Sequence, residues 1–373
     1  MDNSKKIELL DRNKKIIQVV VKEINKKCPD SVDLIGIGGS FCNGDYHEKS
    51  DLDLLIIRNS DAARVLDKTF IMDDIGFDIY TKSWEDIEEL ANYNTPYVTK
   101  LFELGIVYFR NQEVINRIKN IQSTLKSNME NDYIISNRVG NHFRKALEAF
   151  DYLEASKTKS DSYLYFSRVI REIENAIYIL NRRYVKQSIK NIPGEIKTME
   201  ILPEGFVEAY DDIVNCKNTE EMITKASNLL GIVQLYLDSI MIESEYVYEE
   251  KQPAERIPIT KEILIGTYEE LYSNYRGKLY HAIDINNRYL SFMAMVGAQE
   301  FFNEFTDKYL IPEIDLIGKY DPNDLIKNKD AFEEALAIWK RLYDEYGIKV
   351  ENYNGLVEIE SLYKYGQPIK RLL

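Results

Sequence analysis

Residues Gly38 to Ile57 read GGSFCNGDYHEKSDLDLLII, and this stretch decides the fold. Its second half contains an apolar segment, Leu52 to Ile57, with two carboxylates at Asp51 and Asp53. Side chains alternate between the two faces of a strand, so residues two apart point to the same side. Two like charges held about 5 to 7 Å apart repel each other, and a divalent cation is the usual source of the compensating charge.

The composition is that of a globular protein with a full hydrophobic core. The chain has 373 residues, of which 45% are hydrophobic and 29% are charged, and it is long enough for more than one domain. Its first residues are charged, and no run of residues has the apolar length of a membrane span. The three isolated cysteines favour neither a disulfide framework nor a zinc site. We therefore expect a soluble cytoplasmic protein.

The net charge of −14 argues against nucleic acid as the principal partner. Proteins that bind a phosphate backbone rely on Lys and Arg to neutralise it. The 27 tyrosines carry amphipathic rings that suit both interfaces and polar-ligand pockets, and a biased base composition of the source genome would explain them equally well. The charge therefore favours a small or cationic partner.

The N-terminal part of the chain alternates between helical and strand patterns. The patterns predict a helix at 5–27, strands at 32–37 and 51–58, a connecting helix at 61–68, and strands at 76–81 and 103–111. A helical pattern follows from residue 112. We therefore expect a mixed sheet with flanking helices in a domain spanning residues 1–128.

Beyond residue 129 the strand patterns almost disappear. Long segments with apolar residues three and four apart predict a helical bundle at 129–242. Acids and two prolines interrupt the pattern at 243–258, which predicts a linker or long loop. A further, mostly helical region is expected at 259–373. The predicted fold class of the whole chain is α+β.

The opening motif resembles that of the DNA polymerase β-like nucleotidyltransferase superfamily. Gly39 and Ser40 follow a strand, ten residues lead to the acid-hydrophobe-acid unit of Asp51 and Asp53, and Asp78 lies later between two apolar residues. The resemblance implies that Asp51 and Asp53 hold two Mg²⁺ ions and that Asp78 holds the metal that activates the acceptor hydroxyl. It also implies that Gly39 and Ser40 hold the β- and γ-phosphates of a nucleoside triphosphate.

Four other residues near the motif compete for these roles. Asp73 and Asp74 are close to Asp78, but only Asp78 lies between apolar residues in a strand-like segment. His47 and Cys42 lie in the ten-residue loop, where single residues of these types usually serve packing. We therefore keep the three aspartates as the predicted metal ligands.

The segment AIYILNRRYVKQSIK, Ala176 to Lys190, resembles a helix and turn of small-molecule nucleotidyltransferases, including aminoglycoside-modifying types. The resemblance implies that Lys190 touches the triphosphate; the alternative is a solvated surface lysine. It implies transfer of a nucleoside monophosphate, AMP from ATP in the leading version, to a hydroxyl of a small molecule, with antibiotic resistance as the biological role.

Acids of the helical region would suit a cationic acceptor such as an aminoglycoside. Glu148, Glu172 and Glu174 are the candidates, and the alternative is that Glu172 and Glu174 pair with arginines on a helix surface. An acidic cleft favours a cationic small molecule, whereas a basic cleft favours a nucleic acid or a tRNA end.

Two further functions stay open at this level. Arg276 lies five residues before His281, which is similar to the arginine-histidine pair of HEPN-type ribonucleases. That similarity implies a toxin-antitoxin type nucleotidyltransferase acting on protein or tRNA. The other alternative is a pseudoenzyme that binds nucleotide without transfer, against which the intact set of three aspartates argues.

Overall fold

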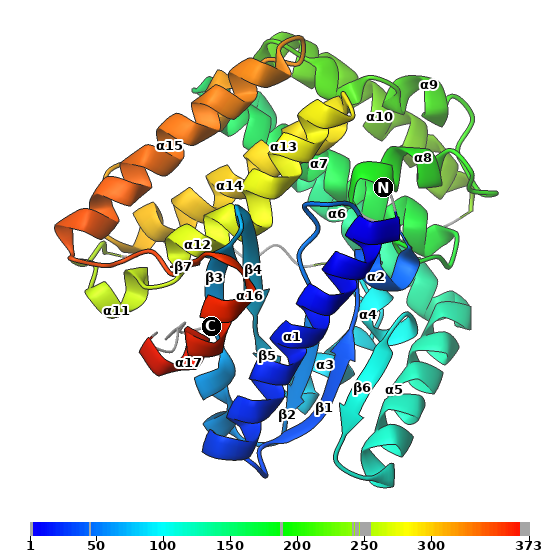
Figure 1. Cartoon of the computed structure of the whole chain (residues 1–373). Helices are drawn as coiled ribbons and strands as arrows, with labels where there is room; N and C mark the ends of the chain where they lie inside the picture. The colour runs from blue at the N-terminus through cyan, green and yellow to red at the C-terminus, as the bar shows by residue number, and fades with distance from the viewer. Residues whose placement is uncertain are drawn as a thin grey trace.

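The computed structural model describes residues 3–44, 46–186, 189–240, 242, 246 and 255–365 of the chain. It confirms the α+β architecture (Figure 1). The N-terminal elements are α1 (Asn3–Lys27), β1 (Val32–Ile37), α2 (Ser40–Asn43), β2 (Leu54–Arg58), η1 (Asp61–Leu66), β3 (Lys68–Met72), β4 (Ile75–Ile79), β5 (Thr81–Lys82), α3 (Trp84–Leu90), α4 (Thr99–Phe102), β6 (Gly105–Phe109) and α5 (Gln112–Glu130).

The strands of the described residues form two sheets that share one stretch of chain. The four-stranded sheet has the order β5-β2-β1-β6, with β1 antiparallel to both neighbours and β2 parallel to β5. The three-stranded sheet has the order β4-β3-β7. Strands β4 and β5 follow each other across Tyr80, so this segment leaves one sheet and enters the other. Asp78 of β4 is thereby brought to the same cavity as Asp51 and Asp53, which precede β2.

Two details differ from the sequence expectations. Strand β2 begins at Leu54, so Asp51 and Asp53 precede the ladder rather than standing in it. Strand β3 was not expected, because its hairpin with β4 turns at Asp73 and Asp74 rather than at glycine. Both aspartates adopt positive φ, 52° and 64°, which this type of turn requires.

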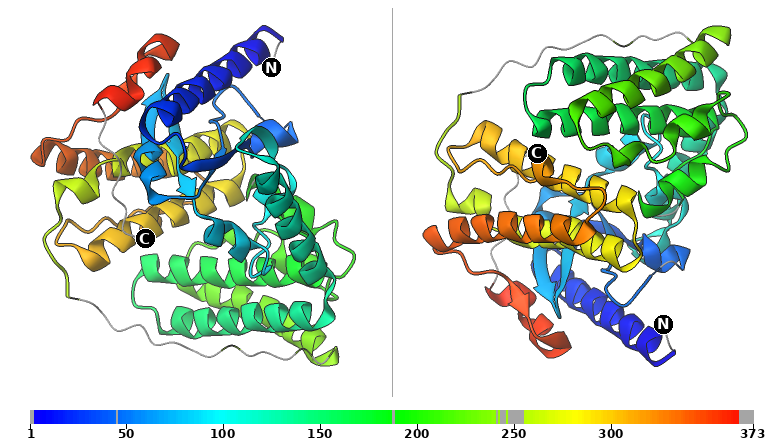
Figure 2. Two further views of the ribbon diagram at one scale, coloured as in Figure 1. Left: turned by 90° about the horizontal axis from the view of Figure 1, so that it is seen from below. Right: turned by 90° about the horizontal axis from the view of Figure 1, so that it is seen from above.

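The four-stranded sheet is covered on both faces. Ile35 and Ile56 belong to a buried cluster with the apolar side of α1, whereas Leu34 and Leu55 belong to a second cluster with α3, α5 and the following helices. Figure 2 shows α1 on one side of the strands and the helical bundle on the other. The strand residues alternate between these two clusters, as their period of two requires.

The expected bundle follows as two long antiparallel helices and a third packed on them. Its elements are α6 (Asp132–Ala155), α7 (Lys159–Leu180), η2 (Ile189–Asn191), α8 (Ile192–Ile196), α9 (Phe206–Tyr210), η3 (Ile213–Asn215) and α10 (Thr219–Ser239). Helix α6 begins at an Asn131 cap, whose side chain accepts from the Ile134 N–H. None of the helices in the described parts of the chain is long and apolar enough to cross a membrane.

The C-terminal region is also mostly helical and ends against the N-terminal domain. Its elements are α11 (Lys261–Leu264), α12 (Thr267–Leu271), the π-helical turn η4 (Tyr272–Arg276), α13 (Gly277–Asp284), α14 (Arg288–Lys308), η5 (Ile317–Lys319), α15 (Leu325–Glu345), β7 (Asn352–Tyr353), α16 (Gly355–Glu358), η6 (Ile359–Ser361) and α17 (Leu362–Tyr365). Strand β7 pairs with β3, and the Tyr363 hydroxyl donates to the Leu66 carbonyl at 3.0 Å.

The hydrophobic core runs through the predicted domain boundaries. Tyr163 of α7 contacts Phe292 of α14 and Tyr320 edge-on, with ring centroids 5.9 and 5.5 Å apart. The same buried cluster includes residues of the sheet and of α15. The division at 1–128, 129–242 and 259–373 stays a prediction, and most of the predicted linker at 243–258 lies outside the described residues.

Candidate active site

A cavity of about 810 Å³ opens where the N-terminal domain, the bundle and the C-terminal region meet. It is lined by the six residues that the sequence singled out: Gly39, Ser40, Asp51, Asp53, Asp78 and Lys190. Four of these come from the ends of β1 and β2, one from β4 and one from η2. The structure therefore brings together residues that are up to 151 positions apart in the chain, Lys190 and Gly39 being the outermost.

Gly39 and Asp53 are locked together at the ends of β1 and β2. The Gly38 N–H donates to the Asp53 carbonyl at 2.9 Å, which extends the antiparallel pairing by one step. Gly39 has φ 64°, and a Cβ built on it would lie 1.7 Å from Asp53 Oδ2. Only glycine allows the Asp53 carboxylate to lie against the turn that starts α2.

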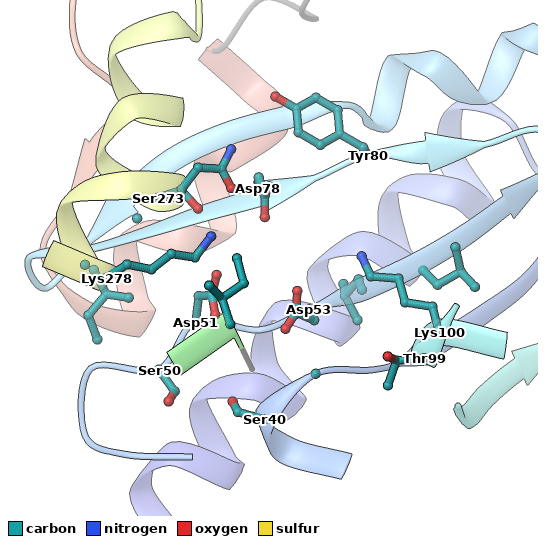
Figure 3. A pocket seen from close by; sticks show the side chains of 18 of the residues that line it. Ser40, Ser50, Asp51, Asp53, Asp78, Tyr80, Thr99, Lys100, Ser273 and Lys278 are labelled. Atoms are coloured by element: carbon teal, nitrogen blue, oxygen red, sulfur yellow. The ribbon is translucent and has the colours of Figure 1, made fainter. Parts of the chain in front are cut away.

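Asp78 reaches the same place from the neighbouring strand segment. The parallel pairing of β2 with β5 sets Ile56 opposite Thr81. Asp53 lies three residues before Ile56, and Asp78 lies three residues before Thr81. The two aspartates therefore lie at similar positions along the strand direction. Figure 3 shows Asp51, Asp53 and Asp78 facing one open space, with Ser40 and Ser50 on one side of it and Tyr80 on the other.

Two of the three carboxylates, Asp51 and Asp78, have a raised pKa. Burial, followed by the charges of Asp53 and Asp78, raises the pKa of Asp51 to about 7. Burial and the charge of Asp53 raise the pKa of Asp78. Lys278 opposes both shifts, and Lys100 opposes the shift of Asp78. The cluster thus holds more negative charge than its surroundings neutralise.

The donor set has the chemistry that Mg²⁺ prefers, namely carboxylate oxygens at the wall of a cavity. As the side chains stand, the described residues contain no group of three or more His, Cys, Asp or Glu placed to hold a metal ion. A shared ion therefore requires the carboxylates to turn toward one another. The chemistry of the donors fits such an ion.

Arg12 of α1 supports the loop that carries Asp51. Its Nη2 donates to the Ser50 carbonyl at 2.6 Å, and its guanidinium lies 5.0 Å from the centre of the Phe77 ring. Burial lowers the pKa of Arg12 to about 10, and the charge of Asp51 partly offsets this effect. The loop itself is closed by two bonds between His47 and Ser50, each 2.9 Å long. These contacts hold the loop that precedes Asp51.

The C-terminal region supplies residues that the sequence motifs missed. Tyr272, Ser273, Asn274, Lys278 and Tyr280 line the cavity, together with Lys100 and Tyr80 of the N-terminal domain. No motif marks them, since they reach the site only through tertiary packing. A Cβ at Gly76 would lie 2.4 Å from the Ser273 backbone nitrogen, so glycine at this position of β4 permits η4 to dock beside Asp78.

Arg276 and His281 line this same cavity. Arg276 Nε donates to Glu333 at 2.7 Å, and its guanidinium lies 4.3 Å from the ring centres of both Tyr272 and Tyr280. His281 stacks on His47. The two residues predicted as a ribonuclease pair therefore have separate partners within the cavity.

Glu148, Glu172 and Glu174 are absent from the cavity lining. Glu172 contacts His142 Nδ1 at 2.5 Å, and Glu148 accepts from the Tyr246 hydroxyl. Glu174 accepts from Tyr210 at 2.5 Å and Tyr289 at 2.7 Å, and burial raises its pKa to about 7. All three glutamates therefore form contacts with histidine or tyrosine side chains outside the cavity. Arg171 forms its ion pair with Glu300, and its charge also acts on Glu172 and Glu174.

The described lining of the cavity holds as many basic as acidic side chains. The basic ones are Lys49, Lys82, Lys100, Lys190, Arg276 and Lys278, and the acidic ones are Asp51, Asp53, Asp74, Asp78, Asp86 and Glu89. The cleft is thus neither an acidic one, as expected for a polycation, nor a basic one, as expected for nucleic acid. Cys42 and Asp73 are not part of it, and Asp74 is held by Tyr272 and Arg276.

Comparisons with known proteins identify the N-terminal part. Residues 15–126 match the family described as nucleotidyltransferase domain. A crystal structure of a nucleotidyltransferase-like protein from Exiguobacterium sibiricum is similar at 10% sequence identity, covering 59% of this chain and 77% of that one, with a TM-score of 0.34. No curated protein matches the chain. Residues 15–126 are therefore similar to a nucleotidyltransferase domain.

Proposed function

We propose that the protein transfers a nucleoside monophosphate, AMP from ATP in the simplest case, to a hydroxyl group of a small molecule and releases pyrophosphate. The observation that carries the proposal is the single cavity lined by Gly39, Ser40, Asp51, Asp53 and Asp78. It combines a glycine-serine turn with three carboxylates whose charges act on one another. Phosphoryl transfer depends mainly on such positioning and charge.

The carboxylates would hold two Mg²⁺ ions. When bound, these ions supply Lewis-acid polarisation of the α-phosphate and neutralise the charge of the leaving pyrophosphate. The backbone at Gly39, without a Cβ, leaves room for phosphate oxygens beside Ser40. Asp51 and Asp53 lie between this turn and Asp78 (Figure 3).

Asp78 is the group proposed to receive the proton of the acceptor hydroxyl. Burial and Asp53 raise its pKa, which makes its carboxylate a stronger base than an exposed aspartate. The hydroxyl oxygen then bonds to the α-phosphorus, and the bond from that phosphorus to the bridging oxygen breaks. The electron pair of the broken bond leaves with pyrophosphate.

The acceptor is proposed to be a small molecule with a hydroxyl group. A cavity of about 810 Å³ lies within the range of small-molecule sites and has room for a nucleotide and a second compound. An aminoglycoside-type antibiotic belongs to this class, although a lining with equal numbers of acidic and basic side chains does not favour a polycation over other small molecules. Antibiotic resistance is the corresponding biological role.

Calorimetry of ATP, GTP, CTP and UTP with Mg²⁺ tests the proposal. The native protein should bind one nucleotide tightly and only with Mg²⁺, and the double variant Asp51→Asn with Asp53→Asn should lose this binding. Asp307→Asn, at an exposed position of α14, is the matched control. A nucleotide that binds equally well to the double variant, or no binding at all, contradicts the proposal. Pyrophosphate release then serves to screen acceptors.

A further inference from the structure

Helix α1 carries one charge where its pattern calls for an apolar side chain. Arg12 lies four residues before Ile16 and eight before Val20, both of which are buried against the strands. Arg12 itself is only 7% exposed. Burying an ion in an apolar setting costs free energy unless the ion finds partners there. Arg12 also precedes residues 15–126, so the match to the family model assigns it no role.

The Arg12 guanidinium contacts the neighbours of two predicted metal ligands. Its Nη2 donates to the Ser50 carbonyl at 2.6 Å, and Ser50 precedes Asp51. Its central carbon lies 5.0 Å from the centre of the Phe77 ring, and Phe77 precedes Asp78. One buried side chain therefore touches both segments.

These two segments belong to different sheets. Asp51 precedes β2 of the four-stranded sheet, whereas Asp78 lies in β4 of the three-stranded sheet. Among the described strands, β2 and β4 are not paired with each other. Their relative position depends on the chain between them and on packing from outside the ladders. Arg12 supplies such packing to both segments at once.

The guanidinium is itself held in one orientation. The Asn13 side-chain oxygen accepts from Arg12 Nε at 3.2 Å and from Nη2 at 3.1 Å. Burial lowers the pKa of Arg12, and the charges of Asp51, Asp73 and Glu8 oppose this effect. Arg12 is not among the described residues that line the cavity. It acts on the carboxylates through the backbone that carries them.

We propose that Arg12 is a positioning residue, which holds the Asp51 and Asp78 segments at the spacing that a shared divalent cation requires. This inference rests on the proposed function. The carboxylates must turn toward a shared ion, so the backbone of both segments has to stay in place while they turn. Residues that support metal ligands in this way typically change metal affinity about 10- to 100-fold when they are removed.

The test measures the binding of Mn²⁺, which takes the same oxygen ligands as Mg²⁺ and is followed by electron paramagnetic resonance. The native protein and Arg12→Met are titrated with Mn²⁺ alone, under conditions in which circular dichroism shows both to be folded. Removing a positive charge would by itself strengthen cation binding. Loss of positioning should instead weaken it about tenfold, so the direction of the change separates the two effects.

Arg58→Met is the matched control. Arg58 is also 7% exposed, and its guanidinium donates to the Thr81 carbonyl at 3.0 Å and to Asp61 at 3.1 Å. It ends β2, whereas Asp53 precedes this strand, and it is not among the described lining residues. Arg58→Met should lose stability as Arg12→Met does, but it should keep the native affinity for Mn²⁺.

Arg12→Lys is a second variant, which keeps the charge and replaces the planar fork by a single ammonium group. It should also bind Mn²⁺ more weakly, and it decides the question if Arg12→Met does not fold. Unfolding of both variants overturns the inference, because Arg12 would then be required for the fold rather than for the site.

Two other results with folded variants also overturn the inference. Unchanged Mn²⁺ affinity at reduced stability would assign Arg12 to the fold alone, and tighter binding by Arg12→Met would leave only its charge as the cause. A native protein that binds no Mn²⁺ overturns the inference as well. The proposed function itself fails only if Mg²⁺-dependent ATP binding is absent too.

Discussion

Gly39 and Asp53 are in such close contact that a single methyl group would separate them. The position of a Cβ at residue 39 lies 1.7 Å from Asp53 Oδ2 and 3.0 Å from Asp53 Cβ. The carboxylate therefore lies in the space that the glycine leaves open. A substitution in the turn at Gly39 will therefore also displace Asp53, which is a predicted metal ligand.

Gly39→Ala should reduce Mg²⁺-dependent ATP binding at least tenfold, because Asp53 must move to accommodate the methyl group. With φ 64° and ψ −148°, Gly39 also has a backbone conformation that is essentially restricted to glycine, so strain adds to the clash. Gly44→Ala is the control for a positive φ without a clash, since Gly44 has φ 73° and ψ 7° and nothing within 4 Å of its added Cβ. It should lose about 1 kcal/mol of stability and keep ATP binding. Equal ATP binding by the two variants would contradict the role of the Gly39 contact.

Gly76→Ala should lower the free energy of unfolding by about 1 to 3 kcal/mol, the usual cost of overpacking. The added Cβ would lie 2.4 Å from the Ser273 nitrogen and 2.8 Å from the Tyr272 carbonyl carbon, which are backbone atoms of η4. Gly231→Ala in α10, with nothing within 4 Å, should be neutral or stabilising. Urea unfolding measures both. A stability of Gly76→Ala equal to that of Gly231→Ala would show that η4 is not packed against β4.

Asp51→Asn should stabilise the protein at pH 8 in EDTA but not at pH 4. The folded pKa of Asp51 is raised to about 7, above its ordinary value of 3.8, so the folded state binds its proton more tightly. The resulting stability is present at low pH and is lost as pH rises from about 4 to 7. One pKa unit corresponds to about 1.4 kcal/mol, so a shift of about three units gives a gain on the order of 4 kcal/mol. Asp307→Asn should show no such pH dependence. A gain for Asp51→Asn that is equal at both pH values would refute titration of the buried carboxylate as its cause.

Glu174→Ala should destabilise the fold by about 2 to 4 kcal/mol and leave ATP binding unchanged. It would leave the buried hydroxyls of Tyr210 and Tyr289 without their acceptor. Glu208→Ala, at an exposed position of the helix that carries Tyr210, should change stability by less than about 0.5 kcal/mol. Thermal unfolding and calorimetry give the two readouts. If Glu174→Ala bound ATP more weakly but kept its full stability, Glu174 would instead have a role in ATP binding.

The sequence predicts the part of the site that depends on local strand geometry. Gly39, Ser40, Asp51 and Asp53 stand at the ends of two adjacent strands, and their spacing alone brings them together. The position of Asp78 also follows from its place in a strand of the same domain. Strand β3, which lies between β2 and β4 in the chain, is not predicted, because aspartates form the turn that follows it. Local patterns carry this information because the residues involved are close in sequence.

The other parts of the site depend on how segments far apart in the sequence pack together. The types of the individual residues do not reveal this packing. Lys278 reaches the carboxylates because η4 docks on Gly76, and nothing in the pattern of either segment records that contact. Glu174 was expected at a cleft, but two tyrosine hydroxyls from other helices make its burial tolerable. Charged residues in helices are therefore assigned reliably only once their partners are known.

The pairing of β7 with β3 has a consequence for how the protein is made. Ile71 pairs with Asn352, so one edge of the three-stranded sheet remains uncovered until almost the whole described chain has been synthesised. The N-terminal domain emerges from the ribosome first, yet its three-stranded sheet is completed last, by β7. Contacts between such distant segments form slowly. A nascent chain cut short before Asn352 should therefore lack the strand pairing that completes the three-stranded sheet, and we expect it to be less stable than the full chain.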